Sequence, residues 1–471
     1  MKLKPYSEYK DSGVLWLGKV PSHWEVRKTK YLFSERVQKG YPDEPLLAAT
    51  QTKGVVPKTH YESRTVVAQK DLHLLKFAKQ GDFVISLRSF QGGIEYAYFQ
   101  GIISPAYTIM TPSKDIKSTY FKHFFKSKPF IELLRTCVTG IREGQNIDYE
   151  ILGRSILPLP SQEEQNYIGQ FLQAKSAQIS RFIRNKRRLI ELLKEQKQAI
   201  INQAVTHGID PNVRLKPSGV EWLGDIPEHW EVRRLRTIAS VKPSGVDKNS
   251  IENEQPVLLC NYVDVYKNEV ITNKIDFMKA TATQDEIRAF ELKAGDVVIT
   301  KDSESWDDIA VPAFVPETLP GVVCAYHLAI VRPNTKLIDG EFLFRAFSSD
   351  PIADQFRVSA NGVTRYGLAQ GAIKSAYFPF PPKEEQRKII EFISEKSSEI
   401  HAAISHAERE IELMREYRKR LIADVVTGKV DVRDVPVETV PQGLEELEEP
   451  TESEEMEEAF GEKEEIQDAD E

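Results

Sequence analysis

Several residues of this sequence have the types and spacing that phosphate-binding sites use, so their neighbours decide whether such a site is present. Gly13, Gly18 and Lys19 have the spacing of a phosphate-binding loop. The next residue is Val20 rather than Ser or Thr, so no hydroxyl group follows the lysine to reach a magnesium ion. The intervening residues are apolar, and a second copy of the stretch has Asp225 in place of the lysine. The pattern therefore argues against a nucleotide site.

Other catalytic and metal-binding patterns are missing from the sequence. It contains no glycine-rich dinucleotide or methyl-donor loop, no Asn-Pro-Pro-aromatic stretch, no His-Glu-x-x-His and no Gly-x-Ser-x-Gly. The nine histidines are scattered, and we expect His23 and His229, which lie in a duplicated stretch, to pack and form hydrogen bonds. Only three cysteines occur, which argues against a disulfide framework and a Cys-rich zinc site. We expect a chain that binds no cofactor and has no catalytic site of its own.

The duplicated stretch indicates the organisation of the chain. "SGVLWLGKVPSHWEVRK" begins at Ser12 and "SGVEWLGDIPEHWEVRR" at Ser218, with 12 of 17 positions identical. A second pair, "PSQEEQ" from Pro160 and "PPKEEQ" from Pro381, opens two similar segments that are offset by 221 residues. The chain therefore reads as globular unit, helix, globular unit, helix. We expect the tryptophans of the first pair to pack each globule against a helix or a partner subunit, with direct DNA contact as the alternative.

Each segment of the second pair is predicted to form one long helix. Ser161 and Glu164 have capping-box spacing, and Gly208 and Gly428 are natural stops, which leaves about 44 helical residues. Apolar residues with a 3-4 spacing predict a coiled-coil seam in each helix. The predicted positions are Ile168, Leu172, Ile179, Phe182, Leu189, Leu193 and Ile200 in the first helix and Ile389, Ile393, Ile400, Ala403, Ala407, Met414 and Leu421 in the second. Two matched seams favour pairing within the chain, and two separate partner-binding helices are the alternative.

Charge is unevenly distributed along the 471 residues. The net charge is −8, but residues 438–471 hold 16 acidic residues and one lysine, so the body is net +7. A mildly basic body with an acidic, nearly aromatic-free end fits a polyanion-binding protein whose tail is disordered. No apolar run is long enough to span a membrane, and no signal peptide is apparent. We therefore expect a cytoplasmic protein without membrane contact.

In this order, the "WLG-x-x-P-x-HWE" openings and the "LPSQEEQ" and "FPPKEEQ" helix starts resemble the specificity subunits of type I restriction–modification enzymes. The resemblance covers residues 12–432. It implies an α+β fold with two similar target-recognition domains separated by two long antiparallel coiled-coil helices, related as a pseudo-twofold duplication. The expected segments are a first recognition domain, a central helix, a second recognition domain, a C-terminal helix and an acidic disordered tail. Their predicted ranges are 1–158, 159–210, 211–380, 381–432 and 433–471.

The resemblance also implies partners and a role. Each recognition domain would read one half of a bipartite, asymmetric site in double-stranded DNA. The subunit would have no catalytic activity, and would direct two adenine methyltransferase (modification) subunits, together with restriction and translocase subunits, to that site. S-adenosylmethionine, ATP and Mg²⁺ are expected on the partner subunits. The alternative function is a coiled-coil scaffold or adaptor without DNA specificity, which predicts acidic or neutral surfaces on both globules.

The best candidates for DNA contact are polar residues where the two globules differ on a shared frame. Arg, Lys, Asn, Gln, Ser and Thr side chains on such loops can read base edges or bind phosphates. In the first globule the candidates are Gln51, Thr52, Lys53, Arg88, Ser89 and Gln91. In the second globule they are Asn261, Tyr262, Asp264, Lys301, Asp302, Ser303 and Trp306. Solvated turns without DNA contact are the alternative for these loops.

Overall fold

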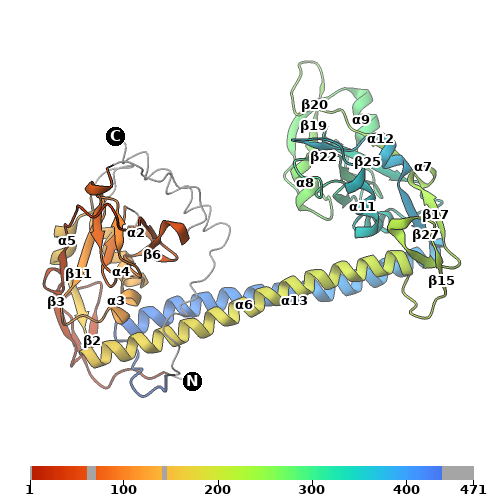
Figure 1. The fold of residues 1–471 in the computed structure, drawn as a ribbon. Coiled ribbons are helices and arrows are strands. Elements are labelled where there is room, and N and C mark those ends of the chain that lie inside the picture. Colours follow the sequence, from red (N-terminus) through yellow and green to blue (C-terminus); the bar gives the residue numbers. More distant parts are fainter. Residues whose placement is uncertain (1–2, 61–70, 88, 140–145, 438–471) are drawn as a thin grey trace. The chain divides into compact units, whose positions relative to one another are not determined.

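The computed structural model describes residues 3–60, 71–87, 89–139 and 146–437. Its contacts divide the chain into two compact units (Figure 1). Unit 1 comprises Met1–Arg187 and Glu408–Glu471, and unit 2 comprises Arg188–Ala407. Each unit therefore contains one globule, half of one long helix and half of the other. The predicted helical segments are thus shared between the two units instead of forming bodies of their own.

The globule of unit 1 is a small α+β body around a four-stranded antiparallel sheet with the strand order β4-β11-β8-β9. The turn at Gly81 and Asp82 leads into β8, and the helices α3 and α4 follow β11. The elements are β1 (Tyr9–Asp11), β2 (Lys19–Pro21), β3 (Glu25–Lys28), α1 (Thr29–Leu32), β4 (Phe33–Glu35), β5 (Leu47–Thr50), β6 (Gly54–Pro57), η1 (Lys58–His60), η2 (Leu72–Leu74), β7 (Lys76–Ala78), β8 (Phe83–Ile85), α2 (Ser89–Gly92), β9 (Glu95–Tyr96), β10 (Gly101–Ile103), β11 (Thr108–Pro112), α3 (Ser118–Phe124), α4 (Lys128–Thr136), β12 (Val138–Thr139), β13 (Asn146–Ile147), α5 (Tyr149–Arg154) and β14 (Ile156–Leu159).

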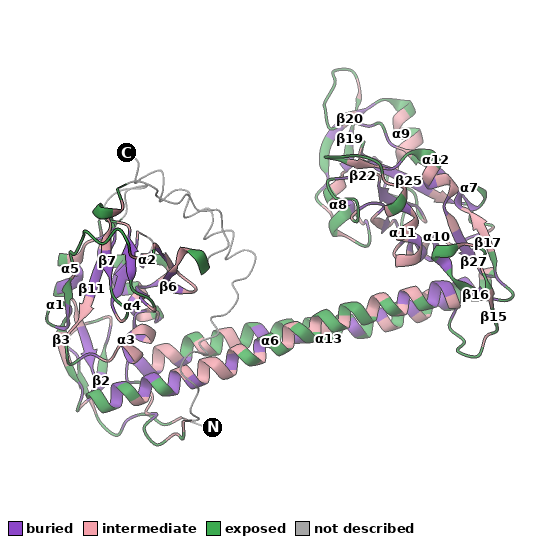
Figure 2. Ribbon diagram, viewed as in Figure 1, coloured by how far each residue is buried: buried purple, intermediate pink, exposed green. Residues whose placement is uncertain are grey.

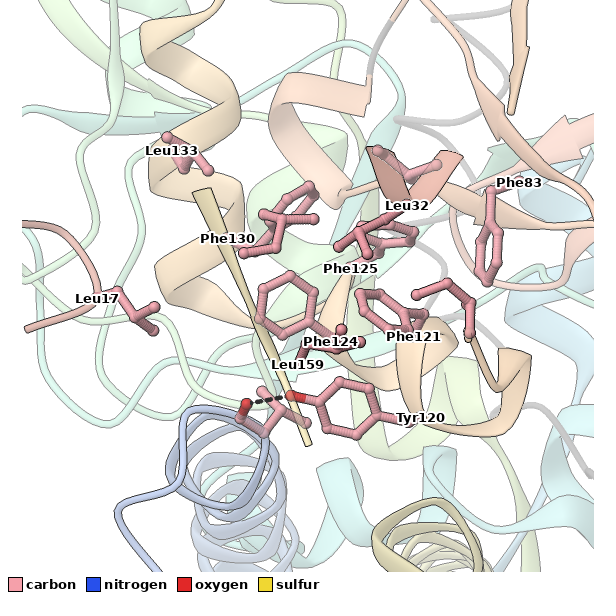
Figure 3. Packing of buried hydrophobic residues seen from close by; sticks show 14 of the residues in the cluster. Leu17, Leu32, Phe83, Tyr120, Phe121, Phe124, Phe125, Phe130, Leu133 and Leu159 are labelled. Carbon is pink, nitrogen blue, oxygen red and sulfur yellow. Dashed lines mark hydrogen bonds between the residues drawn. The ribbon is translucent and has the colours of Figure 1, made fainter. Parts of the chain in front are cut away.

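Aromatic side chains of α3 and α4 fill the core of unit 1 (Figure 3). Phe121, Phe124, Phe125 and Phe130 are fully buried and contact one another edge-on or tilted. The Tyr120 hydroxyl donates a hydrogen bond of 2.6 Å to the carbonyl of Val426 at the end of the second long helix. The globule is thereby fixed to the helix by both apolar packing and a buried polar contact.

The globule of unit 2 repeats this architecture. Its four-stranded sheet has the order β18-β25-β21-β23, which is the same topology as in unit 1. The elements are β15 (Leu215–Pro217), η4 (Glu221–Leu223), β16 (Asp225–Pro227), β17 (Glu231–Arg234), α7 (Leu235–Ile238), β18 (Ala239–Pro243), β19 (Gln255–Cys260), α8 (Tyr262–Lys267), β20 (Met278–Ala282), α9 (Gln284–Phe290), β21 (Val297–Thr300), β22 (Asp302–Ser303), β23 (Pro312–Phe314), β24 (Val322–Cys324), β25 (Leu328–Pro333), α10 (Gly340–Phe347), α11 (Asp350–Ser359), β26 (Tyr366–Gly367), α12 (Gln370–Ser375) and β27 (Tyr377–Phe380). The matched sheet order confirms the duplication.

The two long helices are α6 (Gln162–His207, 46 residues) and α13 (Lys383–Val426, 44 residues), close to the predicted length. Gly208 and Gly428 follow them in the left-handed conformation (φ +76° at both), which glycine adopts without steric cost. In unit 1, Lys186 Nζ lies 2.6 Å from Glu410 Oε2, while Ile168 and Val425 share one core. Later residues of α6 thus meet earlier residues of α13, so the helices are antiparallel.

The seam between the helices departs from the predicted heptad spacing. Buried residues recur every 11 positions, or at twice that interval, as in Ile168, Ile179 and Ile201 and in Leu172, Ile183 and Val205. Leu189, a predicted seam residue, is 40% exposed, and Ala403 is also exposed, so both assignments were wrong. The physical reason is that an α-helix drifts by about 20° per heptad from a 3.5-residue repeat, whereas 11 residues almost complete three turns.

The two duplicated motifs bind each other where each globule meets its long helix. In unit 1, His23 Nε2 lies 2.9 Å from Glu164 Oε2, and in unit 2 His229 Nε2 lies 2.8 Å from Glu385 Oε2. The predicted capping bond from the Glu164 backbone N–H to the Ser161 hydroxyl is present at 3.2 Å. We call each such contact between a "HWE" histidine and an "EEQ" glutamate the junction lock.

Glutamine and tryptophan side chains complete each junction. The amides of Gln165 and Gln386 are fully buried, and each carbonyl oxygen accepts a backbone hydrogen bond of 2.8 Å, from Lys117 and Asp339 respectively. Trp24 and Trp230 are 0% exposed and lie against Gly428 and Gly208. The expectation that these tryptophans and histidines are structural is confirmed for Trp24, Trp230, His23 and His229.

Residues 433–437 belong to the core of unit 1. The Tyr167 hydroxyl on α6 donates a hydrogen bond to the carbonyl of Val435, and Val435 and Val437 pack against the core. The predicted tail boundary at residue 433 was therefore five residues too early. Disorder predicted for the remaining tail concerns residues 438–471, which lie outside the described part of the chain.

Candidate nucleic-acid interface

In unit 1 the structure brings the two predicted loops together. Gln51, Thr52 and Lys53 form the turn between β5 and β6, and all three are half-buried. A side chain at Gly92, in α2, would meet the Gln51 side chain at 2.7 Å, so the two loops touch. Gln91 is exposed beside this contact. The turn and α2 therefore form one polar surface.

One residue predicted for this surface is turned inward in the structure. Ser89 is 0% exposed, and its hydroxyl accepts a hydrogen bond of 2.9 Å from the backbone N–H of Ser86. The hydroxyl is used inside the loop, so the contact of Ser89 with DNA stays a prediction without support from this geometry. Arg88 lies outside the described residues.

Lys126 and Glu95 support the turn from below. Lys126 Nζ donates to the carbonyl of Gln51 at 3.1 Å and lies 2.5 Å from Glu95 Oε1. The Glu95 side chain is only 1% exposed. A buried ion pair therefore holds the backbone of the predicted reading loop, a role that the sequence pattern did not indicate.

In unit 2 the predicted residues also converge. The Tyr262 hydroxyl, on α8, lies 3.5 Å from the Ser303 hydroxyl, on β22. Asn261 and Asp264 form the capping box of α8, with the Asn261 N–H donating to Asp264 Oδ2 at 2.8 Å. Trp306 is 54% exposed in the loop after β22. The segments around residues 261–264 and 301–306 thus form one surface.

Within this surface, buried and helix-capping residues do not present their polar groups to a ligand. Ser303 is 4% exposed, and its hydroxyl accepts from the Ser305 N–H at 3.2 Å. As for Ser89, the hydroxyl is used inside its own loop, and the contact of Ser303 with a base stays a prediction. Asp264 has one carboxylate oxygen committed to the helix cap, so its role in the structure is to set α8.

A chain of polar contacts in unit 2 includes residues that the sequence reasoning missed. His327 Nδ1 lies 3.0 Å from Asp302 Oδ2, and Arg365 Nη2 lies 3.2 Å from His327 Nε2. Lys301 Nζ lies 3.4 Å from Asp302 Oδ2 and 4.4 Å from the centre of the Tyr326 ring, which is 49% exposed. We call Lys301, Asp302, His327, Arg365 and Tyr326 the polar chain.

A sequence signal for the missed residues existed. Tyr326 and His327 follow the buried strand β24, and Arg365 lies in an exposed loop that pairs Asn361 with Gly367. The corresponding stretch of the first globule, residues 140–145, also contains an arginine between glycines. Residues 140–145 lie outside the described part of the chain.

The aspartates of the two Gly-Asp turns are structural. Asp82 binds Arg36 Nε at 2.8 Å in unit 1, and Asp296 binds Arg332 Nε at 2.7 Å in unit 2. Both carboxylates are buried. The two arginines come from β25 in unit 2 and from the end of the neighbouring strand β4 in unit 1. Each turn thus positions the following loop through a buried ion pair.

The electrostatics of the two units are opposite. Without residues 438–471, unit 1 contains 36 basic and 24 acidic residues, a net charge of +12. Unit 2 contains 26 basic and 31 acidic residues, a net charge of −5. The net charge of +7 for the body therefore comes entirely from unit 1. Among the described residues, no cluster of His, Cys, Asp and Glu suited to a metal ion occurs, and no helix is long and apolar enough to cross a membrane.

Comparison with known proteins identifies related sequences and folds. Residues 227–411 match the family model described as the type I restriction modification DNA specificity domain. Two proteins of Methanocaldococcus jannaschii cover 88% of this chain. The putative type I restriction enzyme MjaX specificity subunit is 22% identical and covered over 96% of its own length. The type I restriction enzyme MjaVIII specificity subunit is 21% identical and covered over 95%.

A chain solved in a study of complex assembly and conformational transition of the type I R-M system shares the fold. It has a TM-score of 0.62 and 14% identity, with 87% of this chain and 99% of that chain covered. The HsdS subunit from Thermoanaerobacter tengcongensis has a TM-score of 0.50 at 14% identity, with 87% and 97% covered. The predicted fold class is confirmed.

Proposed function

We infer the function from the family: this chain belongs to the specificity subunits of type I restriction–modification systems. It is a DNA-recognition subunit, in which each globule reads one half of a bipartite, asymmetric target. Unit 1 reads through the turn at residues 51–53 and α2, and unit 2 reads through α8, β22 and the polar chain.

One observation carries this assignment of the loops. The two units share their sheet order and their junction locks, yet they place different side chains on the same frame. Gln51, Thr52 and Lys53 follow β5, and Asn261 and Tyr262 follow the equivalent strand β19. A repeated scaffold with divergent polar loops suits two half-sites of different sequence.

The partners follow from this role. The subunit directs two adenine methyltransferase subunits, and in the full complex restriction and translocase subunits, to the target. S-adenosylmethionine, ATP and Mg²⁺ belong to those partners, while this chain contributes sequence choice alone. The target adenine is flipped and methylated by the partner subunits. The purified chain is expected to give no methyl transfer with S-adenosylmethionine and no DNA cleavage with ATP and Mg²⁺; turnover in either assay would contradict the non-catalytic assignment.

Exchange of one globule tests the function directly. Residues 29–158 are replaced by the corresponding segment of another family member, and methylated sites are mapped in cells that also contain the partner subunits. One half of the target should change and the other half should stay the same. The matched control exchanges residues 235–379, the equivalent segment of unit 2, and should change only the other half. If both halves change in either exchange, the division of reading between the units is wrong.

The alternative, a coiled-coil scaffold without DNA specificity, is not favoured. It leaves the divergent loops of the two globules without a role, and its prediction of acidic or neutral surfaces on both globules fails for unit 1, at +12. In a scaffold, exchanging residues 29–158 would leave the methylated sequence unaltered.

A further inference from the structure

Unit 1 contains a band of basic residues on its halves of α6 and α13. Residues 165–187 of α6 include five basic residues and no acidic residue. The equivalent residues of α13, 386–408, contain three basic and four acidic residues. This run of positive charge is therefore specific to the unit 1 half of α6, whereas residues 408–426 of α13 contain five basic and five acidic residues.

The basic residues follow helical spacing. Arg181, Arg184 and Arg187 are three residues apart on α6, so they lie along one face of that helix. Arg415, Arg418 and Lys419 lie along one face of α13 by the same rule. These six residues are here called the basic band. Arg181, Arg184 and Lys419 are exposed, and Figure 2 shows exposed residues along both helices.

The helix register places the two halves of the basic band at the same level. Lys186 pairs with Glu410, so in an antiparallel pair Arg181, five residues before Lys186, lies level with Arg415, five residues after Glu410. Among the described residues, Arg181, Arg187, Arg415 and Lys419 form no ion pair with a carboxylate. These four cationic groups thus lie along the same stretch of the helix pair.

The acidic C-terminal segment of the same chain complements this charge. Residues 438–471 carry −15, against +12 for the rest of unit 1. Nine of its acidic residues lie between Glu445 and Glu458, with no basic residue among them. Unit 2, at −5, offers this segment no comparable attraction.

The attachment point puts the acidic segment within reach of the basic band. The chain is held to α6 at Tyr167 through Val435. From Tyr167 to Arg181 is 14 residues, or about 21 Å of helix. Glu445 is eight residues after Val437, which allows a reach of roughly 26 Å when extended. A short tether of this kind gives a local concentration of about a millimolar or more.

We propose that the acidic segment 438–471 docks in cis on the basic band of unit 1. Docking brings glutamates beside the arginines of α6 and α13 and neutralises the band. Because the attraction is between exposed charges, it weakens as salt is added. The docked segment competes with other polyanions for this face, so it reduces non-specific adherence of unit 1 to phosphate backbones. The docking itself does not depend on the proposed function.

Zero-length cross-linking of the full chain tests the docking. A carbodiimide joins glutamate carboxylates to lysine amines, and Lys175, Lys186 and Lys419 lie in or beside the basic band. Peptides from residues 438–471 should cross-link to these lysines at low salt, and the yield should fall several-fold at 0.5 M salt, since the Debye length is then only about 4 Å. Mixing isotope-labelled and unlabelled chains should give links within one molecule. Links only between molecules, or links spread evenly over the lysines of both units, would overturn the proposal.

Charge-neutralised variants provide the matched control. The variant Arg181→Gln/Arg184→Gln/Arg187→Gln/Arg415→Gln should lose most of the cross-links. Arg387→Gln/Lys388→Gln/Lys396→Gln, which removes three positive charges from unit 2, should retain them. Circular dichroism spectra check that both variants keep their helices.

A binding measurement separates the acidic segment from DNA as the occupant. Ending the chain at Val437 should increase affinity for a random-sequence duplex by roughly three- to tenfold at low salt. The same truncation in the four-residue variant should give little increase, because the competing surface has gone. If truncation increases the affinity equally in the wild-type chain and in the four-residue variant, the acidic segment does not dock on the basic band. The same conclusion follows if the basic band binds the duplex while the full chain gives no cross-links.

Discussion

Unit 1 and unit 2 have the same scaffold but different surfaces. Both have a four-stranded sheet of the same order, a buried tryptophan and a His–Glu junction lock. Both also have a glutamine clamp, by which we mean the buried Gln165 or Gln386 with the backbone N–H, of Lys117 or Asp339, that it binds. Their net charges nevertheless differ by 17, at +12 and −5 without residues 438–471. The duplicated motifs are therefore those that connect each globule to its long helix. The recognition loops and the net charge of each unit could diverge because they do not form this connection.

The two junction locks also differ in how deeply they are buried. Glu164 is 5% exposed and binds the Tyr6 hydroxyl at 2.8 Å as well as His23, with Arg433 4.0 Å away. Glu385 is 25% exposed and binds His229 and the Trp230 indole N–H. In unit 1 the N- and C-terminal segments of the chain thus add contacts to the lock. In unit 2 the chain runs from α6 directly into the globule, without chain ends beside the lock.

The largest expected effect comes from removing the lock carboxylates. Glu164→Ala should lower the free energy of opening of the unit 1 junction by about 2–3 kcal/mol, because it leaves the buried Tyr6 hydroxyl without its acceptor and removes the partner of the half-exposed His23. Glu385→Ala should cost about 1–2 kcal/mol in unit 2. Native-state hydrogen exchange of the amides in the first turns of α6 and α13 measures both. Equal losses in the two units would show that burial does not distinguish the locks.

A second difference predicts a response to acid. His123, on α3, is half-buried with its Nε2 atom shielded from solvent, and burial, reinforced by the charge of Lys122, lowers its pKa to about 3. The glutamine clamp aligns it with Arg345 of unit 2, which pairs with Glu341 at 3.3 Å and Glu269 at 3.8 Å. One unit thus buries a neutral imidazole where the other buries a paired guanidinium.

Unit 1 should therefore lose stability as the pH falls, beginning near the ordinary histidine pKa of about 6.5. Between pH 6.5 and about 3, His123 binds fewer protons in the folded state than in the unfolded state. The stability that neutral His123 contributes is therefore fully present above pH 6.5 and is lost as the pH falls. Going from pH 7 to pH 5 should cost about 2 kcal/mol. Hydrogen exchange of α3 amides measures the loss, and His123→Leu should flatten the slope. A slope unchanged in this variant would assign the acid sensitivity to other groups.

A smaller effect is expected from the polar chain of unit 2. Arg365→Gln should reduce discrimination at one base pair of the unit 2 half-site by about 1–3 kcal/mol, because a guanidinium fork that reads a base edge is lost. The unit 1 half-site should be unaffected. Methylome mapping of cells with the variant measures the relaxation, and Lys336→Gln, an exposed charge change elsewhere in unit 2, is the control. Relaxation of both half-sites would mean that Arg365 does not read unit 2's bases.

The sequence predicted the repeated features well and the divergent ones less well. Helix length, caps and the roles of Trp24 and His23 followed from local spacing that the fold repeats twice. Leu189 and Ala403 were placed in the seam wrongly because a heptad template accumulates drift along a long helix, whereas Ala407 and Leu421 are buried as predicted. The buried positions of Ser89 and Ser303 were not foreseen, because sequence does not show whether a hydroxyl turns inward to bind its own loop. Arg365 and His327 were missed because the contact of His327 with Asp302 and that of Arg365 with His327 join three segments far apart in the chain.

The smallest expected effect distinguishes phosphate binding from base reading. The positive charge of unit 1 should make it the main contributor to sequence-independent affinity, which falls with salt as counterions are released. Lys53→Gln, at the turn between β5 and β6, should weaken binding of all duplexes alike and reduce the slope of log affinity against log salt by about one. Arg365→Gln should instead weaken the cognate duplex more than a random one, at an almost unchanged slope if its contact is to a base edge. Fluorescence anisotropy of labelled cognate and random duplexes at several salt concentrations gives both quantities, in chains ending at Val437 so that residues 438–471 do not compete. If Lys53→Gln alters the preference between the duplexes while leaving the slope unchanged, the turn at residues 51–53 reads bases, and the charge of unit 1 acts through other residues.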